Sequence, residues 1–157
     1  MIYIVRHGQT DWNLEGRYAG RIDITLNDEG IEQANIIKEE LKNIKFDKVF
    51  SSPLIRAYQT AQIICDNQII KDDRIIERCN GDLEGKLKTE ITYNVDFNDP
   101  NEKKHNIESN LDFRARIKSF LMKLQRFIRG KYIDCNSCRC RYLCKMLFWR
   151  RTYKQQL

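Results

Sequence analysis

The hydrophobic positions of the first half of the chain alternate between short runs and a helical stripe. Met1 to Val5 is an apolar run of β-forming residues and Lys48 to Ser51 is a second one, so both are predicted as buried strands. Between them, Asn27 is a good N-cap for a helix whose apolar face repeats at helical spacing: Ile31, Ala34, Ile37, Leu41 and Ile44. The stretch from Gln9 to Thr25 is rich in turn-forming residues and has no clear period, which favours a loop.

The middle of the chain predicts another helix and two short strand fragments. Ser52 is placed to cap a helix that has Pro53 at its first position. Ile69-Ile70 and Ile75-Ile76 are predicted as strand fragments on either side of a turn, and residues 86–105 as a polar loop.

The most regular stripe follows Ser109 and Asp112, which form a capping-box-like start. A helix is predicted from there to Gly130, with these positions on its apolar face: Phe113, Ile117, Phe120, Leu121, Leu124, Phe127 and Ile128. The order strand, helix, strand, helix predicts an α/β fold with a largely parallel sheet.

Composition narrows the class of protein. The chain has 157 residues, 41% hydrophobic and 32% charged, which is typical of one globular domain. No apolar run approaches membrane-spanning length and the N-terminus does not resemble a secretory signal, so we expect a cytoplasmic protein. The net charge is +6, yet the basic residues concentrate in 114–154 and residues 23–40 are acidic. We therefore expect a small phosphorylated substrate as partner, with neither nucleic acid nor membrane.

Candidate chemistry lies where the first two strands end. Arg6, His7 and Gly8 follow the first strand, and the carboxyl ends of parallel strands share the ligand-binding edge of a sheet. Arg6 and Arg56 each offer a planar fork of donors to phosphate oxygens. A neutral imidazole in this setting can attack phosphorus, and the Glu77 carboxyl can protonate the leaving group and later activate water. This chemistry requires no metal or other cofactor.

Four blocks, in order over residues 1 to about 130, resemble the phosphoglycerate mutase-like histidine phosphatase superfamily. The first is Arg6-His7-Gly8-Gln9-Thr10 with Trp12-Asn13, and the second runs from Gly16 to Asp23 with Leu26 and Gly30. The third is Ser51 to Ala61, and the fourth is Glu77-Arg78 with Gly81 and Leu83-Glu84-Gly85. Glu108-Ser109 before the long helix fits as well.

The resemblance implies a three-layer α/β/α fold with a mostly parallel sheet, altered or truncated at the C-terminus. It implies that His7 is the phosphorylated nucleophile and that Glu77 is the acid and base. It also implies that Arg6, Asn13 and Arg56 bind the phosphate. The chain is short and has no large insertion in its middle, and in this it resembles the phosphatase members more than the mutases.

One family feature is missing. Members carry a second pocket histidine late in the chain, in a Thr-His-Ala-Gly or Thr-His-Gly-Gly block on a central strand. This sequence has two histidines, and the second, His105, lies before the long helix, in the wrong order for that role. Without that strand, Ile2, Ile4 and the long helix would lose a packing partner, so we expect a poorly stable chain with weak or absent activity.

The missing block is replaced by a tail of different texture. We divide the chain into a histidine phosphatase portion, residues 1–130, and an atypical Cys- and Arg-rich tail, residues 131–157. Four cysteines crowd into it and could bind zinc as thiolates, although their spacing is tight for one ion: Cys135, Cys138, Cys140 and Cys144.

A second explanation of the tail is genetic. Codons for residues 132–157 can be chosen so that reading one base later yields a strand followed by Thr-His-Ala-Gly. We hypothesise that the tail is a frameshifted reading of a histidine phosphatase gene, and sequencing the gene tests this.

The leading function is phosphomonoester hydrolysis, and the alternatives are mutase-type phosphoryl transfer and an inactive phosphate-binding remnant.

Overall fold

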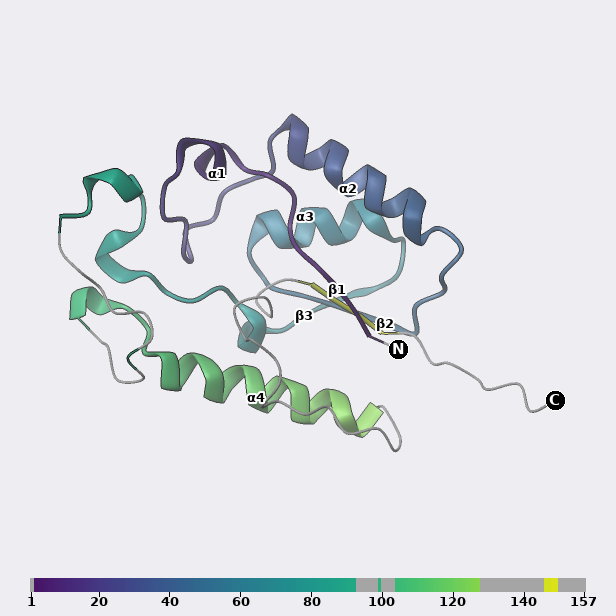
Figure 1. The fold of residues 1–157 in the computed structure, drawn as a ribbon. Coiled ribbons are helices and arrows are strands. Elements are labelled where there is room, and N and C mark those ends of the chain that lie inside the picture. The colour runs from purple at the N-terminus through teal and green to yellow at the C-terminus, as the bar shows by residue number, and fades with distance from the viewer. Residues whose placement is uncertain (1, 93–98, 100–103, 128–145, 150–157) are drawn as a thin grey trace.

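The computed structural model describes residues 2–92, 99, 104–127 and 146–149 (Figure 1). Four strands form one sheet in the order β1-β4-β2-β3; they are β1 (Ile2–Val5), β2 (Lys48–Ser51), β3 (Ile69–Lys71) and β4 (Met146–Trp149). β2 and β3 are parallel, and β4 is antiparallel to both β1 and β2. The first three strands therefore point the same way, which confirms the mostly parallel sheet.

Helices cover both faces of this sheet. α2 (Asp28–Leu41) and α3 (Ile55–Ile64) lie together on one face, and α4 (Asn110–Phe127) lies on the other (Figure 1). Because successive strand side chains point to opposite faces, Val49 packs with the first pair of helices and Phe50 with α4. The three-layer α/β/α architecture is thus confirmed.

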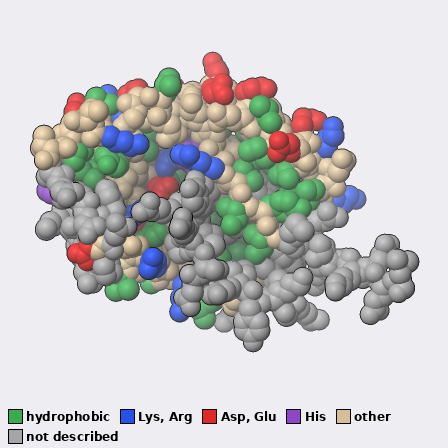
Figure 2. All heavy atoms as spheres, viewed as in Figure 1, with side chains coloured by type: hydrophobic (Ala, Val, Ile, Leu, Met, Phe, Trp, Pro, Cys, Tyr) green, Lys and Arg blue, Asp and Glu red, His purple; other side chains and the backbone are tan. Residues whose placement is uncertain are grey.

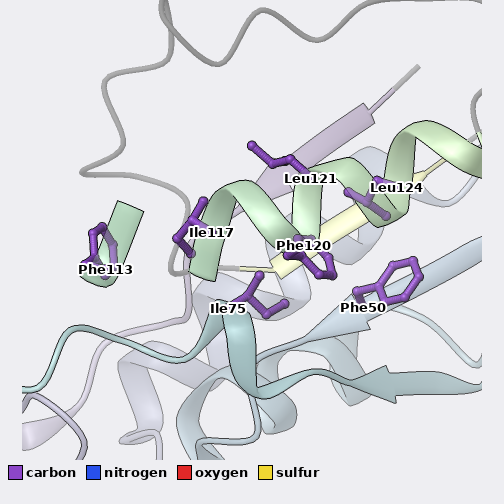
Figure 3. Close-up of a cluster of buried hydrophobic side chains, with 7 residues drawn as sticks. All are labelled: Phe50, Ile75, Phe113, Ile117, Phe120, Leu121 and Leu124. Atoms are coloured by element: carbon purple, nitrogen blue, oxygen red, sulfur yellow. The ribbon is translucent and has the colours of Figure 1, made fainter. Parts of the chain in front are cut away.

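The core under α4 is built from the stripe predicted by the sequence. Phe113, Ile117, Phe120, Leu121 and Leu124 are buried together with Phe50 and Ile75 (Figure 3). The rings of Phe50 and Phe120 lie edge to face, with centroids 5.4 Å apart. The Ser109 hydroxyl accepts from the Asp112 N–H at 3.1 Å, so the predicted helix start is confirmed. The predicted end at Gly130 and the side chains of Phe127 and Ile128 lie outside the described part.

The prediction for α2 is confirmed at its start and partly wrong along its face. The Asn27 side chain accepts from the Gly30 N–H at 2.9 Å, as expected of an N-cap. Ala34 is fully buried, whereas Ile31 is 43% exposed. Ile31 lies in the first turn of α2, and helical spacing alone does not show which turns of a helix are covered by other elements.

Three local predictions are wrong for identifiable reasons. The stretch predicted as a loop contains a short helix, α1 (Asp11–Glu15), because a capping box at Thr10 stabilises a turn too short to show a period. α3 begins at Ile55 instead of Pro53, since Ser52 Oγ accepts from the Leu54 N–H and holds an extra turn before the helix.

The third concerns the predicted strand at Ile75-Ile76, where the chain forms a single 3-10 turn, Asp73–Ile75. The Asp72 side chain caps this turn by accepting from the Arg74 N–H. Further 3-10 turns, Lys88–Glu90 and Lys104–Asn106, lie within the segment predicted as a polar loop.

The expected gap in the sheet is not present. β4 comes from the tail and pairs with both β1 and β2, so the backbone of Met146–Trp149 fills the position between them. The expectation that this position is unoccupied was wrong, because it assumed that only the family's own strand sequence could pair there. The four clustered cysteines and the boundary at residue 130 lie outside the described residues.

Candidate functional site

Two loops leave the sheet at the same edge. β1 and β2 are both antiparallel to β4, so their carboxyl ends at Val5 and Ser51 lie on one side of the sheet. The Arg6-His7-Gly8 segment follows directly after β1, and the loop leading to α3 follows β2. The fold thus brings the first and third sequence blocks to one edge, as parallel strands require.

The His7 segment is seated on the start of α2 by two facing glycines. A Cβ added to Gly8 would lie 2.2 Å from the Gly30 carbonyl oxygen, and one added to Gly30 would lie 2.1 Å from the Gln9 carbonyl oxygen. Neither position has room for a side chain. The contact that requires glycine at both positions is the close packing of the His7 segment on α2.

A buried hydroxyl joins the His7 segment to α3. The Gly8 N–H donates to Thr60 Oγ1 at 3.1 Å, and this hydroxyl donates to the Arg56 carbonyl at 2.7 Å. Thr60 is fully buried. The position of His7 is therefore tied to the helix that carries Arg56.

The His7 ring is half-buried, and its Nδ1 lies 2.7 Å from the Gly8 carbonyl oxygen. A carbonyl only accepts, so this contact assigns the ring proton to Nδ1. In the neutral imidazole, the lone pair is then on Nε2. That tautomer is the one in which Nε2 can act as a nucleophile.

Asn13 belongs to the capping box of α1. Its Oδ1 accepts from the Thr10 N–H at 3.2 Å, and its own N–H donates to Thr10 Oγ1 at 3.3 Å. Because the carbonyl oxygen faces Thr10, the amide NH2 points away from it and presents donors. Asn13 is exposed, as is Arg6.

Arg56 is 2% exposed and holds the loop that follows α1. Its Nη2 donates to the Gly20 carbonyl at 2.7 Å and its Nη1 to the Ile22 carbonyl at 2.9 Å. The Asp23 carboxylate accepts from the Ile55 N–H at the start of α3. The guanidinium thus fixes loop 20–22, a structural role that sequence reasoning did not foresee.

Glu77 lies on the other side of the same loop. Its backbone carbonyl accepts from Arg21 Nε at 3.1 Å, and its carboxylate Oε1 accepts from the Arg78 N–H at 2.9 Å. A continuous series of contacts therefore runs from His7 through Thr60 and Arg56 to loop 20–22, and from there through Arg21 to Glu77. Figure 2 shows acidic, basic and histidine side chains gathered in a recess of this face.

A half-buried carboxylate, Glu108, organises the segment that carries Glu77. It accepts from Arg116 Nε at 2.6 Å and Nη2 at 2.8 Å, and it pairs with Arg21 Nη2 at 3.1 Å. Burial alone raises the pKa of Glu108, but the hydrogen bonds and charges of Arg116 and Arg21 outweigh it, so the pKa is lowered. Glu108 is therefore ionised at neutral pH and is a fixed negative charge beside Glu77.

Sequence reasoning missed Arg116. It is three residues after Phe113 and four before Phe120, which places it on the buried face of α4. A charged residue within an apolar stripe was the available signal, since such a group is retained only where it is paired.

One cavity of the described residues lies away from this site. A cavity of about 570 Å³ is lined by residues at the opposite end of the sheet, among them Leu41, Ile44, Phe46 and Ile64 with Lys38 and Lys45. β2 begins at Lys48, so this cavity is near the amino end of the strand and away from His7. It has no part in the chemistry derived from the sequence blocks.

The described residues contain no group of three or more His, Cys, Asp and Glu side chains arranged to hold a metal ion. In the same residues, no helix has both the length and the apolar character needed to cross a membrane.

Known proteins are similar to this chain in sequence and in fold. Phosphoserine phosphatase 1 of Hydrogenobacter thermophilus is 36% identical over 135 residues, covering 80% of this chain and 64% of that protein. A 2,3-bisphosphoglycerate-dependent phosphoglycerate mutase of Rhizobium meliloti is 41% identical over 95 residues, covering 55% of this chain and 45% of that protein.

Solved structures agree with the sequence relatives. A mutant phosphoserine phosphatase of Entamoeba histolytica in complex with phosphoserine has a TM-score of 0.72 and 31% identity, covering 83% of this chain and 68% of that one. A mycobacterial glucosyl-3-phosphoglycerate phosphatase has a TM-score of 0.70 and 29% identity, covering 80% of this chain and 67% of that one.

The chain spans 64% of the length of the phosphoserine phosphatase of Hydrogenobacter thermophilus that it matches. The sequence model of the histidine phosphatase superfamily, branch 1, matches residues 2–133, which include all four blocks. On this match and on the shared fold, the chain belongs to the histidine phosphatase superfamily, branch 1.

Proposed function

We propose that this chain hydrolyses small phosphomonoesters through a phosphohistidine at His7. The observation that carries the proposal is the 2.7 Å contact between His7 Nδ1 and the Gly8 carbonyl oxygen, which in the neutral ring leaves the lone pair on Nε2. Phosphatases of phosphoserine and of glucosyl-3-phosphoglycerate among the relatives support a small phosphorylated substrate. Arg6, Asn13 and Arg56 are the proposed phosphate ligands.

The reaction has two steps, transfer of the phosphoryl group to His7 and its hydrolysis by water. In the first, His7 Nε2 attacks phosphorus, the bond from phosphorus to the ester oxygen breaks, and the Glu77 carboxyl gives its proton to the departing oxygen. In the second, the Glu77 carboxylate takes a proton from water, whose oxygen attacks phosphorus. The phosphorus–nitrogen bond breaks, inorganic phosphate leaves, and His7 regains its lone pair.

A second candidate is a phosphate-binding protein with little or no turnover. The sequence has two histidines, and the one other than His7 is His105, which is exposed with a φ of 58° in a 3-10 turn. His105 therefore does not supply the second pocket histidine that the family resemblance calls for. Loss of one electrostatic donor in the transition state costs about 10²–10³ in rate, so we expect slow hydrolysis.

Phosphoenzyme trapping tests the proposal. The full chain is mixed with p-nitrophenyl phosphate and quenched, and the phosphoryl group is located by its acid lability. We expect acid-labile label in the wild-type chain and in the matched control His105→Ala, and none in His7→Ala. Label that survives in His7→Ala overturns the nucleophile assignment, and an unlabelled wild-type chain that still binds phosphate supports the second candidate.

The fate of the phosphoryl group separates hydrolysis from mutase-type transfer. The labelled chain is chased in water with and without 3-phosphoglycerate as acceptor. Release as inorganic phosphate at the same rate in both supports a phosphatase. Label recovered in the acceptor supports a mutase instead.

We also propose a cytoplasmic location and a division of the chain at residue 130. Cys65 and Cys79 are free thiols, which fits a reducing compartment. Cell fractionation tests the location. Limited proteolysis tests the division, since a separate tail would be cleaved near residue 130 while the preceding helix survives.

A further inference from the structure

One guanidinium on α4 holds the backbone that carries Glu77. Arg116 Nη1 donates to the Arg74 carbonyl at 2.8 Å and to the Ile76 carbonyl at 2.6 Å. Its Nη2 donates to the Glu77 carbonyl at 3.1 Å. Three backbone acceptors within four residues are thus bound by a single side chain that is about 40 residues away in the sequence.

The guanidinium is itself fixed from the opposite side. Glu108 accepts from its Nε and from its Nη2, so that every nitrogen of Arg116 has a described acceptor. The Phe113 ring centroid lies 4.8 Å from the Arg116 Cζ, and the Arg116 side chain is 16% exposed. A planar fork with a paired carboxylate on one edge and carbonyls on the other has no freedom to rotate.

Arg116 and Glu108 share further contacts with loop 20–22 and with the residues after Glu77. Arg21 binds the same Glu77 carbonyl from loop 20–22 and also pairs with Glu108. The Cys79 N–H donates to Glu108 Oε2, and Arg78 Nε donates to the Glu108 carbonyl. The segment after Ile75 has no regular secondary structure until Gly81, so these side-chain contacts take the place of a strand or helix in holding it.

We propose that Arg116 is the positioning residue for Glu77, and that Glu108 is the counter-charge that keeps Arg116 in place. This inference rests on the proposed function, in which Glu77 transfers the proton. Arg116 contacts the backbone of Glu77 and acts only through it. A displacement of about 1 Å in a reacting group can cost on the order of 10²-fold in rate, so loss of this contact affects the proton-transfer step most.

The leaving group distinguishes positioning from a general structural role. A p-nitrophenolate leaves without a proton, whereas an alkoxide needs one from Glu77. Glu77 also activates water in the second step, which is the same for every substrate, so the comparison is made on the first step alone. We therefore expect Arg116→Gln to reduce the rate of phosphoenzyme formation from an alkyl phosphate such as phosphoserine at least about tenfold more than the rate from p-nitrophenyl phosphate. KM changes little for either substrate.

Matched variants complete the test. Arg114→Gln removes an exposed arginine two residues away on α4 and is expected to leave both substrates unaffected. Arg116→Lys keeps the charge and one set of donors, and restores part of the alkyl activity. An equal loss on both substrates in Arg116→Gln overturns the inference, as does an equal effect of Arg114→Gln.

Phosphoenzyme formation at His7 and amide exchange around Glu77 separate the two proposals. Absence of phosphoenzyme at His7 in the wild-type chain refutes the proposed function alone. Hydrogen exchange of the amides from 74 to 79 then still decides whether Arg116 holds this segment: faster exchange in Arg116→Gln than in Arg114→Gln supports the contact, and equal exchange overturns it. With phosphoenzyme present, the leaving-group comparison decides the positioning role.

Discussion

Asp72 offers the sharpest test of the electrostatics that join the sheet to α4. Its carboxylate accepts from Arg74 Nε at 2.8 Å and Nη2 at 2.6 Å, and from Lys123 Nζ at 3.2 Å. Arg74 Nη1 in turn donates to Ser119 on α4. The Asp72 side chain is 8% exposed, so this network is little screened by solvent.

These contacts set the size of the effect. The hydrogen bond from Arg74 is the largest cause that lowers the pKa of Asp72, from 3.8 to about 2. At about 1.4 kcal/mol for each tenfold change, the ionised carboxylate contributes about 2 kcal/mol to the free energy of unfolding. Because the folded-state pKa is the lower one, this contribution is fully present above about pH 4 and is lost as the pH falls toward 2.

Urea unfolding of the wild-type chain, Asp72→Asn and the control Asp73→Asn measures the contribution. Asparagine keeps the capping function and removes the charge. At neutral pH we expect Asp72→Asn to be less stable by about 2 kcal/mol, and the gap to close by roughly half at about pH 3. Asp73 is exposed, and its variant is expected to follow the wild-type curve. A gap for Asp72→Asn that stays constant between about pH 6 and pH 3 would refute the reasoning.

Two further predictions concern packing. Gly8→Ala places a Cβ 2.2 Å from the Gly30 carbonyl oxygen, and backbone must move to relieve the clash. We expect it to lower the free energy of unfolding by more than the control Gly16→Ala, whose Cβ meets no atom within 4 Å and which costs about 1 kcal/mol for its positive φ. Equal losses of the two variants in thermal unfolding would contradict this. Phe120→Ala leaves a cavity at a fully buried site and is expected to lower the free energy of unfolding by about 3–5 kcal/mol. The control Met122→Ala, on the exposed face of the same helix, is expected to lower it by less than about 0.5 kcal/mol. Similar urea midpoints for the two variants would contradict the burial of Phe120 under α4.

Patterns confined to one element were predicted well from the sequence. The buried stripe of α4 and the N-cap Asn27 depend on residues within a few positions of each other, and both are confirmed. Short elements fared worse. The helix at Asp11 and the 3-10 turn at Asp73 are each stabilised by the side chain of a capping residue, and a cap gives no periodic signal.

The candidate site divides in the same way. His7 at the end of the first strand was identified from local sequence and from the family resemblance, and the structure places it at the shared edge of β1 and β2. The second role of Arg56, as the clamp on loop 20–22, was not identified. The same holds for Arg116 and for the arginine pair on Glu108.

By itself, the sequence determined β1, β2, β3 and the covering helices, because burial of an apolar face leaves a period of two or 3.6 in the residues themselves. It did not determine β4, which comes from the tail. It also determined the family, through four blocks whose residue types are specific. The tertiary structure alone decided which backbone carbonyls Arg56 and Arg116 bind, and which one lies against Gly8. Every residue has a backbone carbonyl, and these lie 22 to 42 positions away, so no residue type marks them before the chain has folded.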